Sequence, residues 1–166
     1  MSVSNLSTGL RPGVCLSTTR PTVPYIGQTI FETDTAKLLI WDGASWAGEQ
    51  QSFTIALGDE VSSITTGNTK VTIRAPFAMK LFKIPRAYLA TASSSGNPTV
   101  DIKVNTVSIF STQLSINANQ KTSTTASTTA VLSSTSIADD AEITFDITTA
   151  GNGAKGLKVV FFYRML

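Results

Sequence analysis

From residue 52 onward, hydrophobic and polar positions alternate in short runs that are separated by turn residues. In residues 70–75, Val71 and Ile73 would face one side and Thr72 and Arg74 the other, as in a half-buried strand. Such runs predict about eight short strands and no helix, which is typical of antiparallel sandwiches. The sequence therefore predicts an all-β fold, a jelly-roll-like antiparallel β-sandwich over residues 52–166. The longest predicted strands lie at residues 53–57, 70–75, 80–84, 86–91, 99–104, 113–116, 142–147 and 156–164.

Residues 79–90 are the one ambiguous stretch, because Met79, Ile84 and Ala87 could also follow helical spacing. Pro85 lies inside this stretch, and a proline breaks a helix or requires a strand edge or a bulge. We therefore expect two strands, at residues 80–84 and 86–91, with a bend between them.

Two polar segments are predicted to form loops. Residues 93–98 are rich in Ser, Gly, Asn and Pro. Residues 117–136 consist almost entirely of Asn, Ser, Thr and Ala, which allows either disorder or an exposed loop with a short strand near residues 130–132. We favour the loop. Binding is usually built on loops at the end of a sandwich, so the candidate receptor-binding residues are Ser94, Asn97, Asn119 and Lys121.

The final predicted strand is apolar on both faces. Leu157, Val159, Phe161 and Tyr163 would face the core of the sandwich, while Val160 and Phe162 would face outward. An exposed apolar patch usually marks an interface. Val160 and Phe162 are therefore the candidate oligomer interface.

Residues 20–50 predict a small β-meander ahead of the sandwich. Strands are expected at residues 29–32 and 38–41, Asp42-Gly43 is a tight-turn signal, and Trp46 is placed to fold back over the hairpin. A sheet of this size is not stable alone, so it must pack on the rest of the chain, on other copies or on a larger assembly. Residues 1–19 lack periodicity and are either a flexible tail or an extended arm that orders on a neighbouring subunit.

The composition restricts the chemistry that this chain can perform. Charged residues make up 14% of the chain and the net charge is +2, without a cluster of Lys or Arg, so we expect no nucleic-acid partner. The chain has no histidine, which excludes Ser-His-Asp and Cys-His catalysis and most zinc sites. We expect no cofactor and no enzymatic activity.

Four acidic residues near the end of the chain are candidates for a site: Asp139, Asp140, Glu142 and Asp146. Two carboxylates can flank a glycosidic bond, and the first three residues could supply oxygen ligands to calcium. We favour a simpler interpretation, in which these residues belong to a turn and to the solvent face of a strand. We accordingly assign no catalytic and no metal-binding residue.

The chain carries one cysteine, Cys15, which we interpret as a small buried apolar residue, with a cross-chain disulfide as the alternative. The N-terminal sequence lacks the features of a secretory signal, and no apolar run approaches the ~20 residues that cross a bilayer. We expect a protein that is made in the cytoplasm, does not insert into membranes and reaches the outside as part of a released particle.

Several segments together resemble a known family. RPGV (residues 11–14), STTRPTVPYIGQTIFETDT (residues 17–35) and WDGASW (residues 41–46) are similar to a short segment of tail-fibre and other minor structural proteins of tailed bacteriophages. The rest of the chain resembles, more loosely, small phage virion β-sandwich proteins, through ITTG (residues 64–67), IADDAEITFDI (residues 137–147) and GAKGLKV (residues 153–159). The resemblance implies a virion structural protein, commonly a trimer and not an enzyme. It makes the meander an anchoring module, with the candidate residues Arg20, Pro21, Pro24, Tyr25, Trp41 and Trp46.

The leading hypothesis is thus a short trimeric tail fibre or appendage, whose N-terminal segment binds other virion proteins and whose sandwich projects toward the host surface. One alternative is a capsid decoration or cement protein, a head fibre on the phage head. A further alternative is a carbohydrate-binding adhesin module that contacts a host glycan. Aromatic rings can stack on sugars, although we expect these rings to serve in packing: Tyr25, Trp41, Trp46, Tyr88 and Tyr163.

Overall fold

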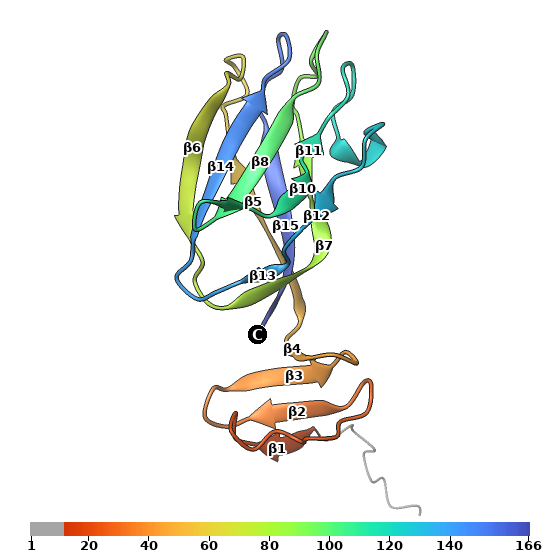
Figure 1. Ribbon diagram of the computed structural model, residues 1–166, viewed down its shortest axis with the longest axis vertical. Coiled ribbons are helices and arrows are strands. Elements are labelled where there is room, and N and C mark those ends of the chain that lie inside the picture. Colours follow the sequence, from red (N-terminus) through yellow and green to blue (C-terminus); the bar gives the residue numbers. More distant parts are fainter. Residues whose placement is uncertain (1–11) are drawn as a thin grey trace, which may run out of the picture. The chain divides into compact units, whose positions relative to one another are not determined.

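The computed structural model describes residues 12–166, and the chain divides into two compact units between Glu49 and Gln50 (Figure 1). Each unit has its own hydrophobic core. Within residues 12–166, every regular element is a β-strand except one short 3-10 turn, η1 (Ser123–Thr125). The all-β fold that the alternating pattern predicted is confirmed.

The N-terminal unit is a four-stranded sheet in the order β1-β2-β3-β4. β2 and β3 form the predicted hairpin, and Trp41 pairs with Trp46 across β3 and β4. Ile30, Leu39 and Trp46 form the core of the unit, with Cys15 and Trp41 packed against them. The strands are β1 (Gly13–Cys15), β2 (Thr29–Glu32), β3 (Lys37–Trp41) and β4 (Trp46–Ala47).

The first strand, β1, was not expected, because the sequence predicted no regular structure before residue 20. β1 pairs in parallel with β2, with Gly13 opposite Ile30 and Cys15 opposite Glu32. The N–H of Thr33 adds a hydrogen bond of 3.0 Å to the carbonyl of Cys15. Three residues carry too little periodicity to predict a strand, and the partner strand lies much further along the chain. The rest of the predicted arm, residues 1–11, lies outside the described residues.

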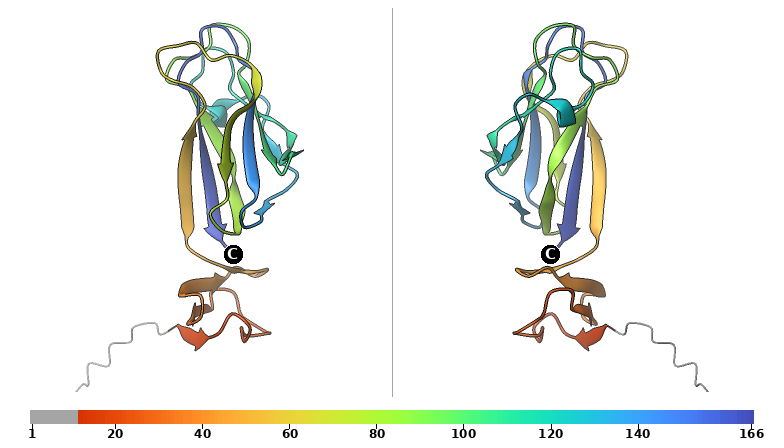
Figure 2. Two further views of the ribbon diagram at one scale, coloured as in Figure 1. Left: turned by 90° about the vertical axis from the view of Figure 1, so that its left-hand side faces the viewer. Right: turned by 90° about the vertical axis from the view of Figure 1, so that its right-hand side faces the viewer.

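The second unit contains two antiparallel sheets. Their long strands are aligned with one common axis, and many of the connecting loops lie at the ends of these strands (Figure 2). One sheet has the order β11-β8-β14-β6, with β9 paired to β8, and the other has the order β13-β7-β15-β5. β10 and β12 form a separate small ribbon. The strands are β5 (Gln50–Ala56), β6 (Gly67–Arg74), β7 (Met79–Tyr88), β8 (Thr99–Val104), β9 (Val107–Ser108), β10 (Phe110–Thr112), β11 (Leu114–Ser115), β12 (Val131–Leu132), β13 (Ser136–Ile137), β14 (Glu142–Thr149) and β15 (Lys158–Met165).

Side chains from both sheets of this unit meet in one core. Phe145 on β14 and Phe161 on β15 are fully buried, and their ring centroids lie 5.7 Å apart in an edge-to-face contact. Phe53 on β5 stacks on Phe161 at 4.9 Å. Burial of one such ring stabilises the fold by about 2–3 kcal/mol. The core face predicted for the last strand is confirmed, because its members are all buried: Leu157, Val159, Phe161 and Tyr163.

The structure corrects the prediction for residues 79–91. Met79–Tyr88 forms one continuous strand, β7, instead of two strands separated by a bend. Its register against β15 shifts on both sides of Phe162, so β7 has one extra residue at Ile84–Pro85 and another at Phe82. A bulge accommodates a proline because the missing N–H does not interrupt a regular ladder there.

The polar segment at residues 117–136 contains the short strand expected near residues 130–132, which is β12. It also contains η1 and β13, which the sequence did not predict. Thr122 caps η1 by accepting a hydrogen bond of 3.2 Å from the N–H of Thr124. Short local bonds of this kind give the segment a defined path despite its low complexity.

Candidate functional site

The residues predicted to anchor the chain have two kinds of environment. Trp46 is buried in the core of the N-terminal unit, and Trp41 packs against it with ring centroids 5.6 Å apart. Tyr25, in contrast, is 71% exposed, while Pro21 and Pro24 are half-buried. The tryptophans therefore hold the unit together, and Tyr25 is available for contact with another molecule.

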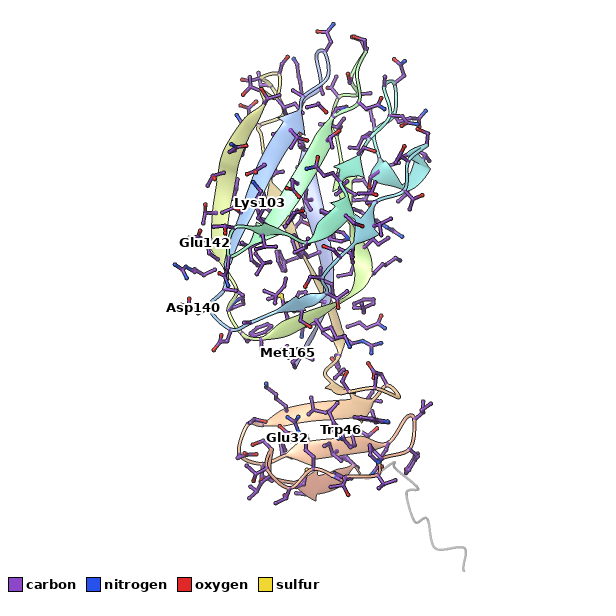
Figure 3. The ribbon with its side chains drawn as sticks, viewed as in Figure 1. Glu32, Trp46, Lys103, Asp140, Glu142 and Met165 are labelled. Atoms are coloured by element: carbon purple, nitrogen blue, oxygen red, sulfur yellow. The ribbon has the colours of Figure 1, made fainter. Side chains whose placement is uncertain are left out.

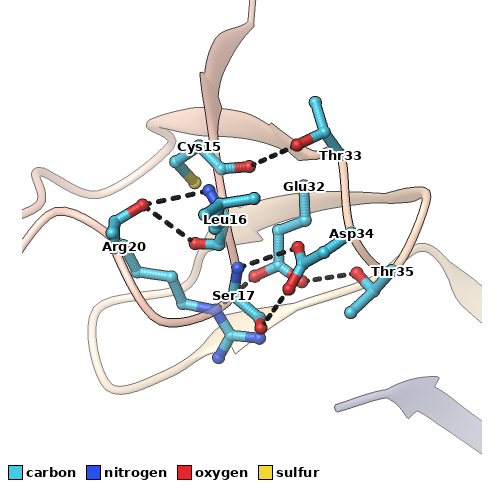
Figure 4. Close-up of polar contacts among 9 residues, drawn as sticks. Cys15, Leu16, Ser17, Arg20, Glu32, Thr33, Asp34 and Thr35 are labelled. Atoms are coloured by element: carbon cyan, nitrogen blue, oxygen red, sulfur yellow. Dashed lines mark hydrogen bonds and ion pairs between the residues drawn. The ribbon is translucent and has the colours of Figure 1, made fainter.

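Arg20, another predicted anchoring residue, forms an ion pair inside the N-terminal unit (Figure 4). Its Nε donates to Glu32, whose side chain is fully buried, and the hydroxyl of Thr35 donates to the same carboxylate at 2.6 Å. Burial by itself raises the pKa of Glu32, but the hydrogen bonds from Arg20 and Thr35 outweigh it and the pKa is lowered. Arg20 is thus a structural residue that neutralises a buried charge.

Asp34, an exposed residue after β2, holds the segment that follows β1. The N–H and the hydroxyl of Ser17 donate to its two carboxylate oxygens, at 2.9 and 2.5 Å. These bonds lower the pKa of Asp34 below its ordinary value. Together with the ion pair of Arg20, they tie the segment after β1 to the end of β2.

The opposite side of this sheet is an exposed apolar surface. The register places Phe31 beside Val14 and opposite Leu38, and Ile40 shares their side because alternate residues of a strand face the same way. Val14 is 70% exposed, Phe31 36%, Leu38 43% and Ile40 44%. We call these four residues the apolar face. The polar residue next to the apolar face on the same side of the sheet is Thr29, which lies opposite Ile40 and carries no charge.

Sequence reasoning missed the apolar face. A signal was present, because β2 and β3 have apolar residues on both sides of the strand, with Ile30 next to Phe31 and Leu39 between Leu38 and Ile40. A small sheet that covers one side with its own loop leaves the other side open.

The predicted receptor loops come together at one end of the second unit, and much of their polarity is used to hold them in place. The Oδ1 of Asn97 accepts the N–H of Ala118 at 2.9 Å, and the N–H of Asn119 donates to the carbonyl of Ser93 at 2.7 Å. The N–H of Ser94 donates to Asn152 at 2.9 Å. Three loops therefore brace one another.

Lys121, the fourth predicted receptor residue, lies next to these loops. Its carbonyl accepts the N–H of Leu89 at 2.9 Å, while its side chain is exposed. The backbone of Lys121 thus fixes the end of β7, and its ammonium group is free to face solvent.

Val160 and Phe162, the predicted oligomer contact, lie on the outer side of β15 and are half-buried. The Nζ of Lys83 and the guanidinium of Arg86 lie over the ring of Phe162, 5.3 and 5.4 Å from its centroid. Phe82 packs against the same ring with centroids 6.4 Å apart. The surface expected to be apolar is therefore an aromatic cluster covered by cations. An oligomer contact through it stays a prediction.

A groove of about 290 Å³ lies beside this cluster, between β7 and the segment that contains η1. Its lining includes Lys83 and Arg86 from β7, and Thr124 and Thr129 from the segment that contains η1. The remaining lining residues are Ile84, Pro85, Leu114, Ser123, Ala126 and Ala130. No single stretch of sequence indicates this groove, because its walls come from three separate segments.

Two of the four acidic residues near β14 share one arginine. Arg74 lies between Asp140 and Glu142, with nitrogen–oxygen distances of 3.6 and 3.8 Å, and Figure 3 shows these two acids near the turn before β14. Asp139 is exposed. In the part of the chain that the structure describes, no three His, Cys, Asp or Glu side chains converge on a point that could hold a metal ion.

The prediction that Asp146 lies on the solvent face of a strand is wrong, because its side chain is only 2% exposed. The Nζ of Lys103 and the N–H of Thr69 each donate to it at 2.6 Å. Burial by itself raises the pKa of Asp146. The hydrogen bonds from Lys103 and Thr69 outweigh this effect, so the pKa lies below the ordinary 3.8. The hydrogen bond from Lys103 in turn raises the pKa of that lysine. Alternation predicts the side of a strand on which a residue lies, not whether neighbouring side chains cover it.

Cys15 is half-buried against the core of the N-terminal unit, and the cross-chain disulfide stays a prediction. Among residues 12–166, no helix is long and apolar enough to cross a membrane.

Compared with protein-family models, with curated proteins and with solved structures, the chain shows no match. The interpretation of its function therefore depends on the surfaces described above.

Proposed function

We propose that this chain is a non-enzymatic structural protein of a tailed-phage particle, a short trimeric tail fibre or related appendage. In this proposal the N-terminal unit attaches the chain to other virion proteins, and the second unit forms the exposed body that contacts the host surface. The resemblance of residues 11–46 to a segment of phage structural proteins suggests the setting. The observation that carries the attachment role is the apolar face.

Two properties of the apolar face support docking onto a protein surface. Its four side chains, between 36% and 70% exposed, form a continuous uncharged patch on a very small sheet. Removing an apolar side chain such as Phe31 or Leu38 from water yields up to about 1.5–3 kcal/mol. An uncharged, apolar surface of a neighbouring virion protein is therefore the complementary occupant, since it would leave no buried charge unpaired.

Particle incorporation of the full chain tests this role. The variant Phe31→Ser/Leu38→Ser makes the apolar face polar without touching the core residues Ile30 and Leu39. We expect its copy number in purified particles to fall by at least about tenfold, measured by mass spectrometry. Tryptophan fluorescence controls for folding, since both tryptophans belong to this unit. Incorporation at the wild-type level would contradict the attachment role.

A matched control removes exposed apolar residues elsewhere. Val61 and Val107 are 80% and 69% exposed and belong to the second unit. Val61→Ser/Val107→Ser should leave incorporation unchanged. If both double variants lose incorporation equally, general surface polarity and not the apolar face is responsible.

Two further measurements test the remaining parts of the proposal. Light scattering of the purified full chain should give the mass of three copies, and a monomer at micromolar concentration would contradict the trimer. Antibodies against residues 117–129 should label the tail in electron micrographs of intact particles. Label over the head would replace the tail appendage by a capsid decoration protein.

A further inference from the structure

The groove beside β7 is formed by an interruption in the edge of its sheet. β13 pairs with β7 only through Ser136 opposite Lys80 and Ile137 opposite Met79. Further along, the N–H of Ala87 donates to the Oγ of Ser123 at 3.0 Å. Between these two attachments, β7 carries the bulge around the buried Pro85, and the groove lies alongside it. Hydrogen bonds to the backbone of β7 therefore hold the neighbouring segments on both sides of the groove.

Two basic residues that line the groove, Lys83 and Arg86, have no carboxylate partner. Among the residues that the structure describes, no Asp or Glu forms an ion pair with Lys83 or Arg86. Both lie over the ring of Phe162, at 5.3 and 5.4 Å, which limits their freedom without neutralising their charge. Two oriented cations with this geometry are suited to bind an anionic group.

The rest of the groove suits a polyhydroxylated ring. Thr124 and Thr129 are exposed lining residues from the segment that contains η1. The hydroxyl of Thr124 lies 3.0 Å from that of Thr122, and no hydrogen bond within the described residues uses the hydroxyl of Thr129. Ile84 and Pro85 give the groove an apolar side against which the C–H face of a sugar ring can pack. A volume of about 290 Å³ lies at the small end of ligand sites and fits one or two sugar units.

We propose that this groove binds an acidic sugar unit of a polysaccharide. Lys83 and Arg86 hold its carboxylate, Thr124 and Thr129 bind its hydroxyl groups, and the ring packs on Ile84 and Pro85. The site lies on a sheet edge and not on the loops predicted from the sequence. It goes beyond the proposed attachment role and does not depend on it, because it belongs to the other unit.

Nucleic acid is the alternative polyanion, and the geometry favours it less. Bases bind single-strand-binding surfaces by stacking on open aromatic faces along a basic track. Here the ring of Phe162 is already covered by Lys83 and Arg86, and Arg164 lies 5.4 Å over the ring of Phe82.

The test is a binding titration of the purified full chain at low salt. The probe is a fluorescently labelled oligogalacturonate, with labelled neutral dextran and single-stranded DNA as comparisons. We expect Lys83→Gln/Arg86→Gln to weaken oligogalacturonate binding by at least about tenfold. Thr129→Val should weaken it by about threefold, because one hydrogen bond is lost. Neither variant touches the core, so thermal unfolding should change little.

The matched control is Lys80→Gln, which removes one charge from the same strand outside the groove. Its affinity should stay within about twofold of the wild type. An equal loss in Lys80→Gln and in the double variant would mean diffuse attraction to a basic surface and would overturn the proposal. Tighter binding of single-stranded DNA than of oligogalacturonate would overturn it in favour of nucleic acid. Equal binding of dextran, or no binding of oligogalacturonate at millimolar concentration, would also overturn it.

Discussion

Asp146 on β14 lies directly opposite Asp101 on β8, and both carboxylates are almost completely buried, at 2% and 5% exposure. Like charges in this position destabilise a sheet unless a cation lies between them. Lys103 offsets the charge of Asp146 through a hydrogen bond of 2.6 Å, and Asp101 accepts the hydroxyl of Ser108 at 2.5 Å. The outer side of this sheet is therefore held together by a small polar network.

The two aspartates are expected to differ in their contribution to stability. Asp146→Ala removes the acceptor of both Lys103 and the N–H of Thr69, and we expect it to lower the free energy of unfolding by about 3 kcal/mol. Asp101→Asn keeps an acceptor for Ser108 and removes the charge opposite Asp146, so its cost should stay below about 1 kcal/mol. Urea unfolding followed by far-UV circular dichroism measures both. A larger cost for Asp101→Asn than for Asp146→Ala would contradict this assignment.

Both units should lose free energy of unfolding at low pH. The pKa values of Asp146 and Glu32 are lowered in the folded chain from 3.8 and 4.5. Such groups contribute stability that is fully present above the ordinary pKa and is lost as the pH falls through the lowered value. We therefore expect constant stability from these groups between about pH 5 and 7 and a decline below about pH 4. Tryptophan fluorescence follows the N-terminal unit, because it contains both tryptophans, Trp41 and Trp46.

Asp146→Asn provides the check on this assignment. It should flatten the pH dependence of the second unit below pH 4 and leave the tryptophan transition of the N-terminal unit unchanged. Circular dichroism and fluorescence, recorded on the same samples, separate the two transitions. A flattened tryptophan transition in Asp146→Asn would show that the two units do not titrate independently.

The ion pair between Arg20 and Glu32 should decide whether the N-terminal unit folds. Arg20→Met leaves the carboxylate of Glu32 buried with Thr35 as its remaining side-chain donor, which costs about 3 kcal/mol. A four-stranded sheet of this size has little stability in reserve, so tryptophan emission should shift toward that of exposed indole. The double variant Arg20→Met/Glu32→Met removes the buried charge and should recover most of the loss. Equal destabilisation in the single and double variants would contradict a charge-based cause.

Much of the fold could be predicted from the sequence, because the alternation of side chains is a local property of a strand. β15 is the clearest case, since spacing alone predicts its buried residues Val159, Phe161 and Tyr163. The failures involve contacts between distant segments. β1 depends on β2, the burial of Asp146 depends on Lys103 from a neighbouring strand, and the groove depends on three segments that have no common pattern. The sequence therefore predicts a binding site on the loops, because their polarity is visible in the local sequence.

Two glycines of the loop between β14 and β15 allow steric clash to be separated from backbone strain. Gly151 and Gly153 both have positive φ, 68° and 71°. A Cβ on Gly151 would lie 2.9 Å from the carbonyl oxygen of Gly96 and closer still to the hydroxyl of Ser93, whereas a Cβ on Gly153 meets no atom within 4 Å. We expect Gly153→Ala to cost about 1 kcal/mol and Gly151→Ala about 3 kcal/mol, as measured by thermal unfolding. Equal costs would mean that the loops give way easily and do not brace one another.

The hairpin between β8 and β9 contains a strained residue whose replacement should stabilise the protein. Asn105 and Thr106 form its two-residue turn with φ of 48° and 73°, the left-handed conformation of a type I′ turn. Asparagine tolerates this conformation, but a β-branched threonine does not, and glycine is the preferred second residue. Thr106→Gly should raise the free energy of unfolding by about 1 kcal/mol, measured by urea unfolding. The same change at the exposed strand residue Thr54 should lower it by about 1 kcal/mol, because glycine there only adds freedom to the unfolded chain. Destabilisation by both substitutions would mean that the threonine makes contacts that outweigh its strain.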